Sequence, residues 1–396
     1  MATYKEQNKQ NVPHLRFPEF EGEWEKCKLG DIATGFDYGM NAPAKVFDGV
    51  NKYIRITDID EASSTYNDSD IVSPDGTLTD TYLVNERDIL LARTGASTGK
   101  SYLYKKTDGK LYFAGFLIRA NVPEHNPYFV FSQLHTHRYW KWVSIMSARS
   151  GQPGINSQEY SSFPIYTTSI QEERKISKLL SLLEERIATQ SKLIEDLKKL
   201  KSAIIEIEYT PNNKNTSHIG DVIEQVSKRN KNNTIQNVLS VSNRQGFIKQ
   251  SEQFENRYVA SEDTSNYKIV ERNDFAFNPA RINVGSIARL TTFENGIVSP
   301  MYICFRTQEN VAPEYIDFFF ESKHFYCEIQ KRLEGSVRQC LSFEGLCNIP
   351  FSLPSLEMQQ RIGKRLFTLG QKIKTETDLL ELLNKQKQYL LRQMFI

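Results

Sequence analysis

The sequence predicts an α+β protein in which one mixed α/β architecture is written twice. The segment FPIYTTSIQEERKI at 163–176 is matched by IPFSLPSLEMQQRI at 349–362, so Pro164 corresponds to Pro350 and the residue numbers differ by 186. Each segment leads into a long helical pattern and follows a stretch of mixed strand and helix signals. We therefore expect two mixed α/β domains in a pseudo-twofold internal repeat, joined by two long antiparallel coiled-coil helices.

Other positions repeat in the same order. Asp88 corresponds to Asp274 and Gly99 to Gly285 at the same offset in residue number, and KLGDI at 28–32 resembles HIGDV at 218–222. A period this long exceeds that of any solenoid unit and indicates a duplicated domain. The expected division is module one at 1–168, a first long helix at 169–209, module two at 210–355 and a second long helix at 356–396.

The two long helices carry coiled-coil seams. Apolar residues recur in steps of three and four, and TPNNKNTS at 210–217 ends the first helix. With about 41 residues each, the helices would be roughly 60 Å long. The first seam comprises Ile176, Leu180, Leu183, Ile187, Ile194, Leu197 and Ile204, and the second comprises Ile362, Leu366, Leu369, Ile373, Leu380, Leu383, Leu390 and Met394.

Polar residues interrupt both seams and suggest a register. If antiparallel partners have residue numbers that add to 577, Lys201 faces Glu376 and Gln190 faces Lys387. Polar seam residues can fix a register at some cost in stability. The expected interface pairs Ile187, Gln190, Ile194, Leu197, Lys201 and Ile204 with Leu390, Lys387, Leu383, Leu380, Glu376 and Ile373, respectively. The alternative, that each helix packs only on its own module, stays open.

The modules themselves show strand and helix signals. Aromatic and β-branched runs predict strands, and longer amphipathic runs predict helices. The expected strands of module one are 53–59, 88–93, 101–106 and 112–120, with a helix at 126–147, and module two has a strand at 297–306 and a helix at 312–333.

Composition excludes several classes of protein. The net charge is only +2, yet residues 81–168 hold 10 Lys and Arg against 5 Asp and Glu, which suits either a phosphate-facing surface or an ordinary solvated face. Five cysteines without a C-x-x-C pair argue against a disulfide framework and a zinc site. Without a signal peptide or a long apolar run, we expect a cytoplasmic protein with no membrane partner.

Three stretches match known catalytic motifs only in part. GASTGKS at 95–101 has three residues, not four, between its first glycine and the Gly-Lys of a phosphate-binding loop. Pro74-Asp75 with 108–110 fits only a loose nuclease pattern, and FNPA at 277–280 lacks the second proline and the aromatic of an adenine methyltransferase. His135 and His137 have no ligand partner at metal spacing. We expect no catalytic residue, no metal and no cofactor in this chain.

Three stretches carry a resemblance to a known family. LRFPEFEGEWEKCKLGDI at 15–32, GSVRQCLSFEGLCNIPFSLPSLEMQQRI at 335–362 and LNKQKQYLLRQMF at 383–395 resemble the specificity subunit of type I restriction–modification enzymes, a restriction system of phage defence. The resemblance covers nearly the whole chain. One departure is the stretch 150–165, which keeps the frame of the second junction without its SVRQ core.

The resemblance implies a fold and a set of partners. Each module would be a target-recognition domain, and the chain would bind double-stranded DNA with an asymmetric bipartite target. It would recruit two modification (methyltransferase) subunits and two restriction (translocase and endonuclease) subunits. S-adenosylmethionine, ATP and Mg would belong to those partners. Half-sites read on one face of the duplex lie about 34 Å apart or a multiple of that, and helix length would set the spacer.

Glycine-containing loops at matching repeat positions are the candidate DNA contacts. Arg and Lys suit guanine edges and phosphates, Asn and Gln suit adenine, and glycine lets a backbone approach a phosphate. The candidates are Arg93, Thr94, Ser97, Lys100, Arg149, Gln152 and Asn156 in module one, and Asn278, Arg281, Asn283, Ser286, Ser336, Arg338 and Gln339 in module two. For each single residue, solubility or local turn bonding remains an alternative.

Two other functions remain open. The chain could be a self-contained duplicated nuclease or methyltransferase, or a coiled-coil interaction protein without a DNA function. Activity of the purified chain on DNA would favour the first, and failure to bind DNA at low salt would favour the second.

Overall fold

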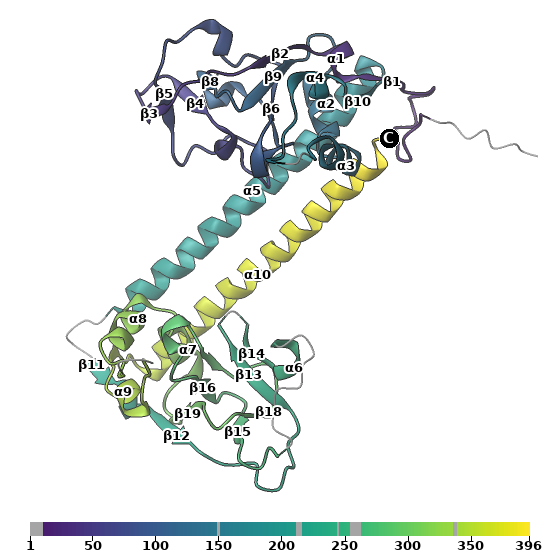
Figure 1. The fold of residues 1–396 in the computed structure, drawn as a ribbon. Helices are drawn as coiled ribbons and strands as arrows, with labels where there is room; N and C mark the ends of the chain where they lie inside the picture. The colour runs from purple at the N-terminus through teal and green to yellow at the C-terminus, as the bar shows by residue number, and fades with distance from the viewer. Residues whose placement is uncertain (1–10, 149–150, 211–215, 244, 254–262, 336–338) are drawn as a thin grey trace, which may run out of the picture. The chain divides into compact units, whose positions relative to one another are not determined.

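One four-stranded antiparallel sheet is built twice (Figure 1). The structure, a computed structural model, describes residues 1–396 except 1–10, 149–150, 211–215, 244, 254–262 and 336–338. The strand order is β2–β9–β6–β7 in module one and β12–β19–β16–β17 in module two. The strands are β2 (Thr34–Tyr38), β9 (Leu117–Asn121), β6 (Asp88–Ala92) and β7 (Ser101–Leu103), then β12 (Ile223–Val226), β19 (Ile303–Thr307), β16 (Phe275–Phe277) and β17 (Ile287–Arg289). The predicted α+β class with two domains is confirmed.

Two compact units each combine a module with parts of both long helices. Unit 1 holds residues 1–190 and 379–396, and unit 2 holds residues 191–378. The helices are α5 (Ile170–Tyr209) and α10 (Leu356–Gln393), and both begin within one residue of the predicted start. The unit boundary thus cuts across the predicted division into modules and helices.

The remaining elements of unit 1 are short. Two-stranded pairings and helices surround the main sheet, and β4 and β8 pair in parallel. The elements are β1 (Glu25–Lys28) with β10 (Pro164–Thr167), β3 (Ala44–Val46) with β5 (Val72–Pro74), β4 (Lys52–Ile54) with β8 (Leu111–Phe113), and the helices α1 (Leu29–Ile32), α2 (Pro127–Gln133), α3 (His137–Met146) and α4 (Ser157–Ser161).

Unit 2 adds a second four-stranded sheet in the order β14–β13–β18–β15. The strands are β14 (Gly246–Lys249), β13 (Val238–Ser242), β18 (Asn295–Val298) and β15 (Lys268–Glu271), and the remaining elements are β11 (Thr216–His218) with β20 (Pro350–Ser352) and the helices α6 (Gln250–Gln253), α7 (Pro313–Phe319), α8 (Lys323–Gln330) and α9 (Phe343–Cys347).

Each long helix predicted inside a module is two helices. The segment 126–147 forms α2 and α3, and the segment 312–333 forms α7 and α8. Thr136 and Ser322 occupy equivalent repeat positions, and each caps the second helix by accepting a hydrogen bond from a backbone N–H three residues on. A hydroxyl at this position satisfies an N–H that the first turn leaves unpaired, so it starts a new helix. The apolar pattern continues through the break, which is why the prediction of one helix was wrong.

Two predicted strands are also divided. The segment 112–120 contains the end of β8, a turn and β9, and the segment 297–306 contains the end of β18, a turn and β19. The segment 53–59 holds only the end of β4, followed by a 3-10 turn at Ile56–Asp58. Strands 88–93 and 101–106 are found as β6 and β7, shorter by one and three residues.

The core of each module lies between the sheet and its paired helices. In unit 1, Leu91 and Ile118 of the sheet share a buried cluster with Tyr139 of α3. In unit 2, the rings of Phe275 and Phe305 stack with centroids 5.1 Å apart in a cluster that also holds residues of α7, α5 and α10. Burial of apolar area stabilises by about 25 cal/mol per Å². The long helices are therefore part of each core.

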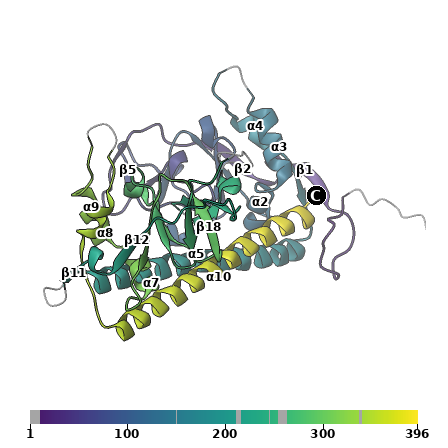
Figure 2. The ribbon, with the colours of Figure 1, turned by 90° about the horizontal axis from the view of Figure 1, so that it is seen from below.

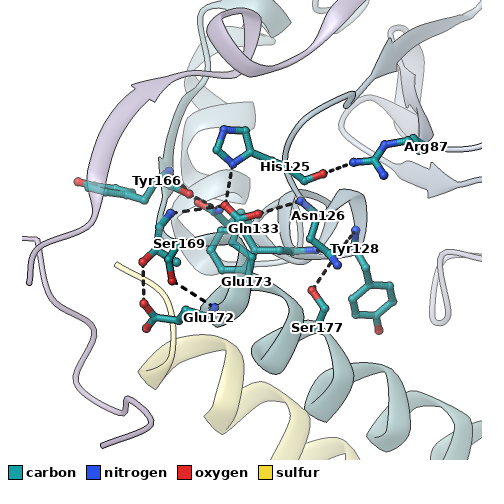
Figure 3. Close-up of polar contacts among 12 residues, drawn as sticks. Arg87, His125, Asn126, Tyr128, Gln133, Tyr166, Ser169, Glu172, Glu173 and Ser177 are labelled. Atoms are coloured by element: carbon teal, nitrogen blue, oxygen red, sulfur yellow. Dashed lines mark hydrogen bonds and ion pairs between the residues drawn. The ribbon is translucent and has the colours of Figure 1, made fainter. Parts of the chain in front are cut away.

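The repeated junction segment connects each long helix to the first turn of a helix in its module, and Figure 3 shows this contact in unit 1. In unit 1, Glu173 of α5 accepts a hydrogen bond of 2.8 Å from the backbone N–H of Asn126 and lies 2.8 Å from His125 Nδ1. In unit 2, Gln359 of α10 accepts a hydrogen bond of 3.0 Å from the N–H of Ala312. Asn126 and Ala312 are the N-caps of α2 and α7. Glu173 and Gln359 differ by 186 in residue number, and so do Asn126 and Ala312. The matching junction sequences therefore form the same contact in both units.

We expect Glu173→Ala to lower the free energy of unfolding of unit 1 by about 2 kcal/mol, because it leaves the part-buried N–H of Asn126 without the acceptor that the buried Glu173 side chain supplies. Glu173→Gln should cost much less, since glutamine performs the same role at Gln359. Urea unfolding followed by tryptophan fluorescence measures the effect, because all three tryptophans lie in residues 24–142. Equal loss in both variants would contradict the capping role.

The seam prediction agrees with the burial of α5 and α10. All twelve residues of the predicted interface are buried or half-buried. Within each unit the two helices run side by side in opposite directions (Figures 1 and 2). In unit 1, Leu180 of α5 and Leu391 of α10 belong to one apolar cluster with Trp24. In unit 2, Ile205 of α5 and Leu366 of α10 belong to one apolar cluster of that unit.

The ion pairs between the helices point to a different register. Lys387 Nζ lies 2.8 Å from Glu184 in unit 1, and Arg365 Nη1 lies 4.0 Å from Glu208 in unit 2. The residue numbers of these pairs add to 571 and 573, whereas the predicted register required 577. Lys201, predicted to face Glu376, forms an ion pair with Glu321. These sums differ from the predicted one by six and four, so the two ion pairs lie about one to two helical turns from the predicted register.

His135 makes unit 1 sensitive to acid. Burial, reinforced by nearby Lys387, lowers the pKa of His135 to about 4, although Glu184 opposes the shift. The neutral ring fits its contacts: Nδ1 lies 2.9 Å from the Phe131 carbonyl oxygen and Nε2 lies 3.0 Å from Ser64 Oγ.

We expect the stability of unit 1 to fall by about 1–3 kcal/mol as pH drops from 6.5 toward 4, because the unfolded chain then binds a proton that folded His135 does not. Stability from this group is fully present above pH 6.5. Urea midpoints between pH 4 and 8 measure it. His135→Gln should flatten that part of the profile, and the exposed His137→Gln serves as control; an unchanged slope in His135→Gln would contradict the assignment.

Along the stretches that the structure describes, no helix has the length and apolar character needed to cross a membrane.

Candidate nucleic-acid interface

The two candidate loops of module one are joined through their main chains. Ile155 N–H donates to the Arg93 carbonyl at 2.9 Å, and Gly95 N–H donates to the Pro153 carbonyl at 2.9 Å. Thr98 Oγ1 donates to the Gly95 carbonyl at 2.8 Å and closes the turn. The sequence predicted two separate loops. In the structure they lie side by side, joined at Arg93 and Gly95, and form one loop edge.

The end of the first loop is fixed on helix α3. Gly99 has φ +93°, and a Cβ there would lie 2.8 Å from Val143 Cγ1. Its N–H donates to Tyr160 Oη, and its carbonyl accepts from Tyr139 Oη at 2.8 Å. A glycine is thus required both by conformation and by space.

The side chains on this edge differ in freedom. Gln152 and Asn156 are exposed, and Arg93, Thr94, Ser97 and Lys100 are half-buried. Lys100 lies 3.3 Å from Glu61, an exposed pair of small energetic weight. Asn156 caps α4 by accepting from Glu159 N–H at 2.9 Å, so its side-chain oxygen already has a structural role. Arg149 lies outside the described residues.

Module two joins its loops at the equivalent place. Leu341 N–H donates to the Pro279 carbonyl at 3.0 Å. These residues are the repeat equivalents of Ile155 and Arg93. Ile155 and Leu341 therefore take equivalent positions, although the sequences around them differ. Of the candidates at 335–342, Gln339 is exposed, and Ser336 and Arg338 fall outside the described residues.

Two candidates of module two face the interior. Asn278 is 9% exposed and accepts from Ala280 N–H at 3.0 Å, and Ser286 is 2% exposed with its Oγ 3.5 Å from the Val241 carbonyl. Their predicted contact with DNA is corrected to a role in shaping the loop, because short polar side chains beside a tight turn satisfy local backbone groups. Arg281 is exposed and Asn283 is half-buried, as a contact residue requires.

A cleft of about 640 Å³ opens beside Arg93. Tyr38 and Phe116 line it and are 41% and 58% exposed. The sequence prediction missed both residues, since its candidates were charged, amide and hydroxyl side chains and included no aromatic residue. An aromatic residue next to a glycine, as in DYG and GF, was the available signal. Metal-binding clusters of three or more His, Cys, Asp or Glu do not occur in the described part of the chain.

Comparison with known proteins identifies the family. Residues 21–199 and 211–385 each match the model of the type I restriction modification DNA specificity domain. The chain belongs to this family. Each match contains one copy of the sheet and most of the long helix that follows it, so each module of this type I specificity protein holds a target-recognition domain, and DNA recognition is its role.

Relatives cover the specificity protein along its length. The MjaVIII type I restriction enzyme specificity subunit of Methanocaldococcus jannaschii is 22% identical and covers 98% of this chain and 94% of its own. The S subunit of the type I restriction-modification system of M. genitalium superposes with a TM-score of 0.64 at 15% identity, covering 97% and 99%. A chain from a type I system solved for complex assembly and conformational transition gives 0.51 at 13%, covering 94% and 97%. These structures support the fold.

Proposed function

We propose that this chain is the non-catalytic recognition and scaffold subunit of a type I restriction–modification complex and reads an asymmetric bipartite DNA target. Each target-recognition domain reads one half-site. The observation that carries the proposal is the equivalent pairing of loops by main-chain hydrogen bonds, Arg93 with Ile155 and Pro279 with Leu341. The main-chain pairing of the loops is the same in both modules, while the side chains of the loops differ. The two modules should therefore recognise different half-sites.

A basic segment of the sequence supports DNA as the ligand of module one. Residues 81–168 hold twice as many Lys and Arg as Asp and Glu. Positive side chains neutralise phosphates and release counterions, which makes binding dependent on salt. Phosphate contacts orient the protein, and the exposed loop side chains then select bases.

The long helices supply a surface for partner subunits. In unit 2, α5 exposes Leu193, Leu200 and Ile207 at 40%, 50% and 76%, spaced by one heptad. Exposed apolar residues at this spacing form a stripe that suits a partner helix. This stripe supports recruitment of partner subunits. We propose that these are two modification and two restriction subunits in the cytoplasm. S-adenosylmethionine, ATP and Mg would be bound by them, with no cofactor bound by this chain.

Mapping methylated adenines in cells with and without this chain tests the proposal. We expect a bipartite motif that vanishes when the chain is absent. A motif that persists, or one without an unread spacer, would overturn it. The purified chain incubated with DNA, Mg and S-adenosylmethionine should neither cut nor methylate, and either activity would favour the self-contained enzyme.

A further inference from the structure

The cleft beside Arg93 has the composition of a nucleobase site. Its volume is about 640 Å³, and the exposed rings of Tyr38 and Phe116 line it together with backbone of the turn at 114–116. A nucleobase is bound through its flat face by aromatic side chains and through its edge by hydrogen bonds. The two rings provide the first kind of contact, and Arg93 provides donors for the second.

Arg93 is the cation that remains available in this cleft. Its guanidinium carbon lies 4.6 Å from the centroid of the Tyr38 ring, and Nη1 is 3.4 Å from the Gly115 carbonyl oxygen. No carboxylate pairs with it among the residues that the structure describes. Arg55, which also lines the cleft, is held by Asp58 through two hydrogen bonds of 2.8 Å. Of the two arginines, Arg93 is therefore the one with donors available for the edge of a base.

The cleft is continuous with the loop edge of module one. Arg93 N–H donates to the Phe116 carbonyl at 3.0 Å, and the Arg93 carbonyl accepts from Ile155 N–H at 2.9 Å. One residue thus lines the cleft and joins the two loops. A duplex bound on the loops borders the cleft directly.

Module two does not repeat these side chains. Tyr38 pairs with Ile118 and Val226 pairs with Cys304, and the two partners are repeat equivalents, so Val226 takes the place of Tyr38. Pro279 takes the place of Arg93. Tyr302, the repeat equivalent of Phe116, is only 8% exposed and packs in one apolar cluster with Val226. The module-two positions thus hold one buried aromatic residue and the half-buried Val226 and Pro279, and they lack the guanidinium.

We propose that this cleft binds a nucleobase of the half-site read by module one, with Tyr38 and Phe116 contacting the ring and Arg93 donating to the base edge. The inference rests on the proposed function and deepens it. It assigns sequence selection in module one to side chains that module two does not possess. The two half-sites are then read by different chemistry, not only by different residues.

Selection of duplexes from a random pool by the full chain, assembled with the modification subunits of its own system, tests the assignment. Phe116→Ala should weaken binding to the wild-type target about 10-fold and relax base preference in one half-site only. Arg93→Lys keeps the charge but loses the planar fork, so affinity should stay within about 3-fold while preference at one base pair falls about 10-fold.

Tyr326→Ala is the matched control, because Tyr326 is an aromatic residue of unit 2 that is 55% exposed. It should leave the motif and the affinity unchanged. Retention of both half-sites in Phe116→Ala and Arg93→Lys would overturn the cleft assignment while the bipartite reading stands. Loss of preference in both half-sites would also overturn it. Failure of the wild-type complex to enrich any motif would instead refute the proposed function.

Discussion

Leu366→Ala is expected to lower the free energy of unfolding of unit 2 by about 3 kcal/mol. Leu366 is 0% exposed and lies in the largest apolar cluster of unit 2, where α10 packs with Ile205 of α5 and Phe319 of α7. Truncation removes buried methyl groups and leaves a cavity among side chains from three helices, which cannot all relax toward it. Urea unfolding followed by far-ultraviolet circular dichroism measures the loss.

The neighbouring residue provides the control. Phe367 is 52% exposed, so Phe367→Ala should change the free energy of unfolding by less than about 0.5 kcal/mol. Hydrogen exchange in β16 and β19 should accelerate in Leu366→Ala alone. Similar effects of both substitutions would show that α10 is not an integral part of the module-two core.

Exchange of residues 210–355 for module two of another family member is expected to replace one half-site of the recognised motif and to preserve the other. The exchanged segment begins just after α5 ends at Tyr209 and ends just before α10 begins at Leu356. Its contacts with the long helices include the cap from Gln359 to Ala312 and the apolar cluster around Leu366. A donor that keeps an apolar core there retains the frame and brings its own loops.

Methylation mapping of cells that carry the exchanged chain provides the measurement. Methylation of the original bipartite target should fall to background, and a new motif should share its module-one half and its spacer. The wild-type chain expressed from the same vector is the control. Replacement of both half-sites, or a changed spacer, would show that module two influences more than its own reading surface.

The fold was predictable wherever the sequence repeated itself. Matching junctions at 163–176 and 349–362 were enough to predict two similar domains and two long helices. The two copies of the repeat can be aligned with each other, so no second protein is needed for the comparison. The breaks at Thr136 and Ser322 were missed. A single hydroxyl caps the start of the second helix at each place, while the spacing of apolar residues continues through the break. The two ion pairs between the helices are offset from the predicted register by four and six residues, because long charged side chains at the edge of a seam are not placed by the apolar pattern.

The candidate interface was predictable as loops and less so as residues. Glycine and polar composition identified the loops that the structure joins, but Asn278 and Ser286 proved to serve the turn itself. Phe116 escaped notice because an exposed aromatic ring is indistinguishable from a core residue in sequence alone. Its exposure follows from the turn between β8 and β9, a tertiary feature.

The main-chain hydrogen bonds that join the loops, Arg93 to Ile155 and Pro279 to Leu341, have an evolutionary consequence. Because they use only backbone atoms, the exposed side chains beside them can change without undoing the pairing, whereas Gly99, Asn278 and Ser286 shape the loops and are constrained. New specificities can then arise by single substitutions or by recombination, and each intermediate remains a folded protein. A restriction system that must act on changing foreign DNA gains from a specificity subunit whose loop side chains can vary while its main-chain scaffold stays the same.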